Sequence, residues 1–264
     1  MESRVLQRRT RFGLTLFLAV VWSCALAGGA AAEWVSLGGA AGAEVDVQVT
    51  ESSPDRIVLE YTLPGFHADP VEIDGATYYK ITLPGESSLL EEGLAELPHV
   101  CRSVIIPDQA AMEASVLSAD VETFAGLPVI PSKGNLLRTV DPADVPYRFD
   151  AQYEAAGWYP PQMVSVGEPY ILRDYRGLVV EALPFQFDGA EGTLQVARRM
   201  TIELRANGTD LTNSFDRFGP PEKVVRGFLD LYRHHFLNWG MDRYTPVPEE
   251  GSMLVITYDA FHSA

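Results

Sequence analysis

Apolar and polar residues alternate through most of the chain between residues 44 and 204. Residues 57–63 carry apolar side chains at odd positions, and residues 194–204 carry them at even positions, a series that only Arg198 interrupts. A period of two buries one face of a strand and leaves the other in water. Turn pairs separate the runs, among them Pro64-Gly65, Asp74-Gly75 and Asn207-Gly208. The pattern predicts a mainly β fold, an antiparallel β-sandwich over residues 44–243.

The periodicity changes after Pro221. Apolar residues then recur at steps of three and four, which predicts a C-terminal helix over about 221–239, with Gly240 suited to its end. The Pro-rich polar stretch 240–251 is expected to be an exposed linker. The apolar run 253–258 is typical of a buried parallel strand. We therefore expect residues 244–264 to be the truncated start of an α/β domain.

The first 32 residues have the composition of a secretory signal peptide. Four arginines lie in residues 4–11, residues 12–27 are apolar, and small residues follow to Ala32. An uncleaved anchor helix is the alternative, although the apolar run is short for a membrane span. Residues 33–43 are rich in Gly and Ala, and we expect a flexible lead-in there. The chain is thus expected to be exported to the extracellular space or cell surface, with no stable membrane span once the signal is removed.

The chain is strongly acidic. Its formal charge is −16, and removal of residues 1–32 leaves 16 basic and 35 acidic side chains, a charge of −19. Phosphate recognition requires clustered Lys and Arg, so this balance argues against nucleic acid as a partner. The simpler interpretation is a solvated acidic face, and docking to a basic surface is the alternative.

Cys101 is the single cysteine outside the signal segment. Its apolar surroundings favour a small buried hydrophobe in a strand. His99 lies two residues away and shares the same strand face, so a thiol enzyme built on this pair is an alternative that predicts labelling of Cys101 by a thiol reagent. His234 and His235 lack helical metal-ligand spacing, and we interpret them as cations near a helix C-terminus. No metal site, cofactor or catalytic residue is predicted within the fragment itself.

Three ordered stretches resemble the precursors of the gingipain family of secreted cysteine endopeptidases. Together they place the resemblance between about Leu97 and Tyr258. The stretches are Ile130 to Pro142 with Val145-Pro146-Tyr147; Pro169 to Gly177 with Pro184-Phe185-Gln186-Phe187 and Gly192-Thr193-Leu194; and Arg243 to Val247 with Met253-Leu254-Val255-Ile256.

This resemblance implies a prodomain that covers the active-site cleft of its own downstream, caspase-like catalytic domain. Arg138, flanked by Leu137 and Thr139, matches the arginine that enters the specificity pocket, and a guanidinium can form a bidentate pair with a pocket carboxylate. Lys133 is the alternative if the enzyme prefers lysine.

The resemblance also implies maturation by a processing peptidase at the Arg243-Tyr244 bond. The catalytic Cys and His would lie beyond Ala264, so peptidase activity is an expectation for a whole precursor. The competing hypothesis is a stand-alone exported β-sandwich used for adhesion or carbohydrate binding.

Overall fold

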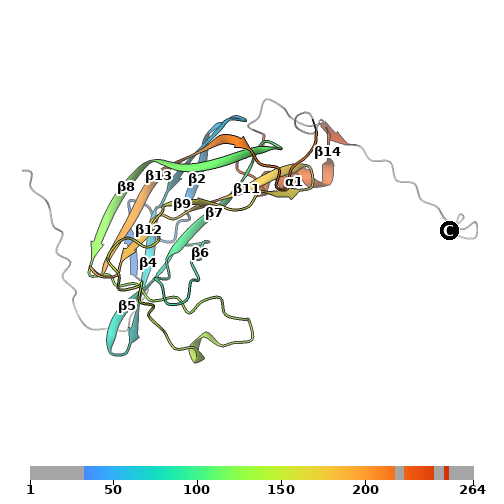
Figure 1. Cartoon of the computed structure of the whole chain (residues 1–264). Coiled ribbons are helices and arrows are strands. Elements are labelled where there is room, and N and C mark those ends of the chain that lie inside the picture. Colours follow the sequence, from blue (N-terminus) through green and yellow to red (C-terminus); the bar gives the residue numbers. More distant parts are fainter. Residues whose placement is uncertain (1–32, 218–222, 241–246, 250–264) are drawn as a thin grey trace, which may run out of the picture. The chain divides into compact units, whose positions relative to one another are not determined.

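The computed structural model describes residues 33–217, 223–240 and 247–249. Three antiparallel sheets make up most of this region (Figure 1). The largest strands form a sheet with the order β12-β13-β3-β2 and with β8 also paired to β13. The bounds of its strands are β2 (Asp46–Ser52), β3 (Arg56–Thr62), β8 (Ala110–Ala125), β12 (Phe185–Asp188) and β13 (Thr193–Thr209).

A second sheet has the order β10-β11-β7-β6, with β9 also paired to β11, and a third has the order β1-β4-β5. The second sheet comprises β6 (Ser87–Ser88), β7 (Pro98–Ile105), β9 (Val164–Val166), β10 (Tyr170–Leu172) and β11 (Tyr175–Ala182). The third comprises β1 (Glu33–Ser36), β4 (Gly65–Ile73) and β5 (Ala76–Thr82).

The core lies between the inner faces of these sheets. Leu59 and Ile202 from the first sheet and Val100 and Val180 from the second are all fully buried in one cluster, joined by Phe66 from β4. Burying the apolar face of each strand in this way is the arrangement that the period-two pattern requires. The predicted antiparallel β-sandwich is therefore confirmed.

Local irregularities of the sheets follow from single residues. Asp74 and Gly75 both have positive φ values, 51° and 84°, as a two-residue hairpin turn between β4 and β5 requires. Arg198, which interrupts the apolar series of β13, lies at a register shift against β8 and points outward to Asp120 at 2.7 Å. The bulge keeps the charged side chain out of the core.

The structure corrects the expected flexible lead-in at its first residues. Residues Glu33–Ser36 form β1 and pair with β4, where Trp34 lies opposite His67 with ring centroids 5.0 Å apart. Gly65 makes room for this contact, because a Cβ there would lie 2.4 Å from the Trp34 ring. An aromatic and a β-branched residue suit a strand edge, and they outweigh the Gly- and Ala-rich composition that follows.

The predicted helix over 221–239 is also wrong in its extent. Residues 223–225 form strand β14 (Lys223–Val225), which pairs in parallel with β15 (Val247–Glu249). A 3-10 turn, η2 (Arg226–Phe228), then leads into the short helix α1 (Leu229–His235). The apolar stripe is nevertheless real, because Val224, Tyr232 and Phe236 are buried together against Tyr175. Adjacent β-branched valines and Gly227 disfavour a helix over its first half.

Several predicted features lie outside the described residues. These are the signal segment 1–32, most of the predicted linker 240–251, the Arg243-Tyr244 bond and the apolar run 253–258. Within the predicted linker, residues 247–249 form β15 and pair with β14, so this part is not an irregular linker. In the part of the chain that the structure describes, no helix has the length and apolar character needed to cross a membrane.

Candidate functional site

The predicted inhibitory loop leaves the sheets at Ser132 and returns through η1 (Pro142–Asp144). Figure 1 shows this segment, in yellow-green, projecting at the end of the sandwich away from α1. Ser132 is fully buried. Its amide donates to the Leu94 carbonyl at 2.7 Å, its carbonyl accepts from the Gly93 amide at 2.9 Å, and its hydroxyl oxygen accepts from the Gly134 amide at 3.1 Å. The start of the loop is thereby fixed to the segment that contains Gly93 and Leu94.

Lys133 closes the base of the loop. Its Nζ donates to the Pro142 carbonyl at 2.8 Å and stands 4.0 Å from the centre of the Tyr147 ring. Asp141 caps the returning turn, because its Oδ1 accepts from the Ala143 amide at 2.9 Å. Both ends of the loop therefore have defined positions, and Lys133 is already occupied by intramolecular contacts.

The tip of the loop is exposed. Leu137 is 74% exposed, the highest value among the large hydrophobic residues of the described chain that lie at the surface. Arg138 and Thr139 are exposed as well, and the Val140 amide donates to the Leu137 carbonyl at 2.9 Å to form a tight turn. The three residues that the resemblance selects thus lie together at the outermost part of an anchored loop.

Arg138 has no ion pair or hydrogen bond within the described residues. Most other described arginines lie within 4 Å of a carboxylate, from Arg56 with Glu51 and Glu203 to Arg217 with Asp108. The chain is strongly acidic, so a loop arginine without an acidic partner among the described residues can pair with a carboxylate of another protein or domain. Lys133, the alternative pocket residue, already contacts the Pro142 carbonyl and the Tyr147 ring, so its ammonium group is less available to a pocket carboxylate.

Arg176, from the second resembling stretch, has a structural role. Its side chain is fully buried and forms an ion pair with Asp210 at 2.9 Å. Its guanidinium also donates to backbone carbonyls that belong to Pro107, Ala110, Asp210 and Thr212. Arg176 therefore stabilises the sandwich from within, whereas the nearby Arg173 is half exposed and its guanidinium carbon lies 4.6 Å from the centre of the Phe228 ring.

Cys101 is exposed, which corrects its interpretation as a buried hydrophobe. In β7 the alternate residues Val100 and Val104 face the core, so Cys101 and His99 face outward together. The Sγ atom lies 3.9 Å from His99 Nδ1, and the cross-strand partner of Cys101 in β11 is Glu181. Sequence spacing could not predict that Glu181 lies beside this pair, because it is 80 residues further along the chain.

The geometry does not support a thiol enzyme at this pair. The thiol of Cys101 is only partly desolvated, but this partial burial, together with the carboxylates of Glu181 and Glu86, raises its pKa above the ordinary value. A nucleophilic cysteine requires a lowered pKa. His99 Nδ1 is moreover 2.5 Å from Glu181 Oε1 and so is engaged with the carboxylate.

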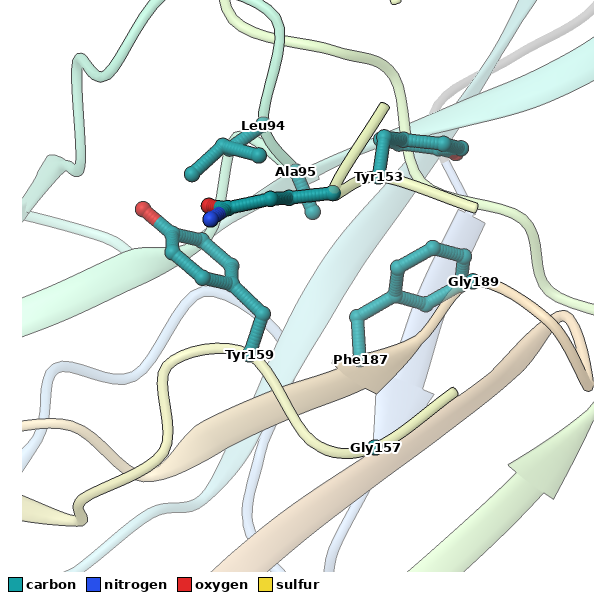
Figure 2. A pocket seen from close by; sticks show the side chains of 8 residues that line it. Leu94, Ala95, Tyr153, Gly157, Tyr159, Phe187 and Gly189 are labelled. Carbon is teal, nitrogen blue, oxygen red and sulfur yellow. The ribbon is translucent and has the colours of Figure 1, made fainter. Parts of the chain in front are cut away.

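A small cavity lies beside the base of the loop. It is lined by Leu94, Ala95, Gln152, Tyr153, Gly157, Tyr159, Phe187 and Gly189, and Figure 2 shows the rings of Tyr159 and Phe187 directed into it. Its volume of about 10 Å³ corresponds to the space of one water molecule. This hollow is a packing defect between aromatic side chains and has no room for a small-molecule substrate.

Sequence reasoning selected the tip of the loop and missed its anchors. Asp141-Pro142 carries a recognisable signal, because Asp is a preferred N-cap and Pro a preferred first helical residue. Buried Ser132 and the contact of Lys133 with Tyr147 leave no local signal, because their partners are defined only by the path of the whole loop.

Comparison with known proteins identifies this fold. The family model Propeptide_C25 matches residues 40–240. Gingipain R1 of Porphyromonas gingivalis is 28% identical over 92% of the chain, which spans 24% of that relative, and Lys-gingipain HG66 from the same species is 26% identical over 53% of the chain, which spans 8% of that relative.

Two solved structures share the fold. A complex of Porphyromonas gingivalis RgpB pro- and mature domains has a TM-score of 0.68 at 22% identity, covering 74% of this chain and 97% of that one. A structure on the zymogenic latency of gingipain K has a TM-score of 0.56 at 20% identity, covering 67% and 100%.

The fold and these matches define a gingipain-type protease prodomain. The chain belongs to the Propeptide_C25 family. This assignment favours the prodomain over a stand-alone adhesion or carbohydrate-binding module. The chain spans a quarter or less of the length of the gingipains that it matches.

Proposed function

We propose that this chain is the inhibitory N-terminal part of an exported cysteine endopeptidase precursor, in which Arg138 occupies the specificity pocket of the downstream catalytic domain. The observation that carries the proposal is the exposed Arg138, which has no ion pair among the described residues, at the tip of a loop whose base is fixed by Ser132 and Lys133. An anchored loop loses little conformational freedom on binding, so more of its contact energy contributes to affinity.

The chemistry of the tip fits a pocket that recognises arginine. The planar guanidinium can donate two parallel hydrogen bonds to a carboxylate at the bottom of a pocket. Leu137, the residue before Arg138, supplies exposed apolar surface for contact with the enzyme, and Thr139 is the residue after it. Held in this pose, the loop fills the pocket and prevents substrate from entering it.

The related structures support the choice of partner. One is a complex of the pro- and mature domains of RgpB, and the other concerns the zymogenic latency of gingipain K. By extension, the partner of this prodomain is its own catalytic domain, which would contain the Cys and His that carry out proteolysis.

Release would follow cleavage by a processing peptidase after Arg243, before Tyr244. This bond lies outside the described residues, three positions after Gly240. The chain before it is held by Asn238, whose side chain hydrogen-bonds both the amide and the carbonyl of Ile105 in β7. The last described residues before the bond are thus fixed to β7.

Inhibition by variants of residues 33–243 tests the proposal. The wild-type fragment is added to an arginine-specific gingipain-type enzyme, and its inhibition constant is compared with that of Arg138→Ala. Loss of a buried charge pair costs about 2–5 kcal/mol, which corresponds to a roughly 30- to 4,000-fold weaker inhibition.

Arg199→Ala is the matched control. Arg199 is also exposed and has no ion pair within the described residues, but it lies on strand β13 rather than in the loop. It should leave inhibition unchanged, and Lys133→Ala should weaken inhibition less than Arg138→Ala, because it loosens the loop without removing the pocket residue. Equal inhibition by wild type and Arg138→Ala, or an equal loss with Arg199→Ala, would refute the proposed role.

A further inference from the structure

A row of polar side chains crosses the outer face of the second sheet. Glu181 in β11 is paired with Cys101 in β7 and with Ser165 in β9, and His99 in β7 is paired with Ser87 in β6. Four adjacent strands thus bring one thiol, one imidazole, one carboxylate and two hydroxyls onto the same face. The ligand atoms of His99, Cys101 and Glu181 all lie within 4.8 Å of one another.

We propose that His99, Cys101 and Glu181 form a binding site for a divalent zinc-type metal ion. Zinc takes thiolate, imidazole and carboxylate ligands at about 2.0–2.3 Å, so tetrahedral ligands lie roughly 3.3–3.7 Å apart. The Cys101 Sγ to His99 Nδ1 separation of 3.9 Å is close to this spacing. Glu181 Oε1 lies 2.5 Å from the same nitrogen, and a bound metal would lengthen this distance by about 1 Å.

The surrounding hydrogen bonds match those of a metal site. A ligating histidine usually donates its other ring nitrogen to a neighbouring group, and ligating carboxylates are themselves hydrogen-bonded. His99 Nε2 lies 2.7 Å from Ser87 Oγ, and Ser165 Oγ donates to Glu181 Oε2 at 2.5 Å. Two of the three ligands are therefore already oriented by groups that would remain in contact with them after the metal binds.

The binding step balances in protons and charge. In the neutral imidazole the Nδ1 proton leaves for solvent as Nδ1 coordinates the ion, and Nε2 takes up a proton from solvent. The Nε2–H group then donates a hydrogen bond to Ser87 Oγ. The Cys101 thiol loses its proton to solvent. Thiolate and carboxylate together neutralise a divalent ion, and a water molecule completes the tetrahedron. The bound ion would link β7 to β11.

Cobalt and zinc titrations of the chain test this site. Co²⁺ should bind at one ion per chain with a thiolate-to-metal charge-transfer band, and Zn²⁺ should displace it and protect Cys101 from a thiol reagent until a chelator is added. Cys101→Ser should abolish the band. His99→Gln should weaken Zn²⁺ binding at least tenfold, and Ser87→Ala, which leaves all three ligands in place, should weaken it roughly 10- to 100-fold.

His234→Gln is the control for adventitious binding by exposed histidines. His234 lies on α1, where its Nδ1 contacts the Asp230 carbonyl at 2.6 Å, and its removal should leave affinity unchanged. Absence of stoichiometric Zn²⁺ binding would overturn the proposal. So would binding that Cys101→Ser and His99→Gln leave unaltered, since the acidic surface would then account for it.

Discussion

Replacement of Arg176 by methionine should destabilise the sandwich more than any exposed charge change. The side chain is fully buried between β11, the segment that leads into β8 and the segment that follows β13. Methionine fills a similar length but donates no hydrogen bonds. The substitution leaves the carbonyls that belong to Pro107, Ala110, Asp210 and Thr212 without this donor.

The expected loss is about 3–5 kcal/mol in the free energy of unfolding. Removing one partner of a buried, hydrogen-bonded charge costs this much, because the remaining polar groups stay desolvated. Asp210 is 28% exposed, so water can reach it, and we expect the lower half of the range. With a urea m value of about 2 kcal/mol/M, a loss of ~3 kcal/mol lowers the unfolding midpoint by about 1.5 M.

Urea unfolding followed by tryptophan fluorescence measures this change, with Arg198→Met as the control. Arg198 and its partner Asp120 are each about half exposed, and such a surface pair contributes about 0–1 kcal/mol. If Arg176→Met shifted the midpoint no more than Arg198→Met, the assignment of Arg176 as a buried organising residue would be wrong.

Two further predictions concern the second sheet. Gly177→Ala should lower stability by about 1–3 kcal/mol in thermal unfolding, because its Cβ would lie 2.5 and 2.8 Å from two aromatic rings, one of them Phe236; Gly167→Ala, whose Cβ would make ordinary contact at 3.6 Å, should change little. Burial raises the pKa of the Glu181 carboxyl. Hydrogen bonds from Ser165 and His99 outweigh this effect and lower the pKa overall. A lowered carboxyl pKa stabilises the fold above the ordinary value of about 4.3 and loses this effect as pH falls through the folded-state pKa, so the stability difference between wild type and Glu181→Gln should shrink below about pH 4.3. A difference that grows on acidification would contradict the assignment.

The sandwich could be predicted from sequence because its strands are amphipathic. Positions such as Leu59 and Ile202 alternate with polar neighbours, and burial of one face follows directly. The C-terminal helix was predicted too long because helical and extended segments can both place Val224 and Tyr232 in one cluster. The periodicity of apolar residues indicates which side chains are buried. Whether the backbone at residues 223–225 is helical or extended depends on the pairing of β14 with β15, which sequence spacing does not reveal.

For the candidate sites too, local features could be predicted from the sequence, whereas features that depend on long-range contacts could not. The place of Arg138 in a resembling stretch is visible in the sequence, whereas its lack of an ion pair among the described residues depends on where the nearby carboxylates lie in space. His99 and Cys101 are recognisable as same-face neighbours because they are two residues apart in a strand. Glu181 joins them only through the register of β11 against β7, and long-range register has no local signature in one sequence.

Inhibition of two enzymes by one substituted prodomain tests the central claim most directly. Arg138→Lys keeps the positive charge but replaces the planar fork by a single ammonium group. If Arg138 occupies the specificity pocket, this substitution should weaken inhibition of an arginine-specific gingipain-type enzyme and strengthen inhibition of a lysine-specific one, so that the ratio of the two inhibition constants changes. An unchanged ratio would show that Arg138 lies outside the pocket.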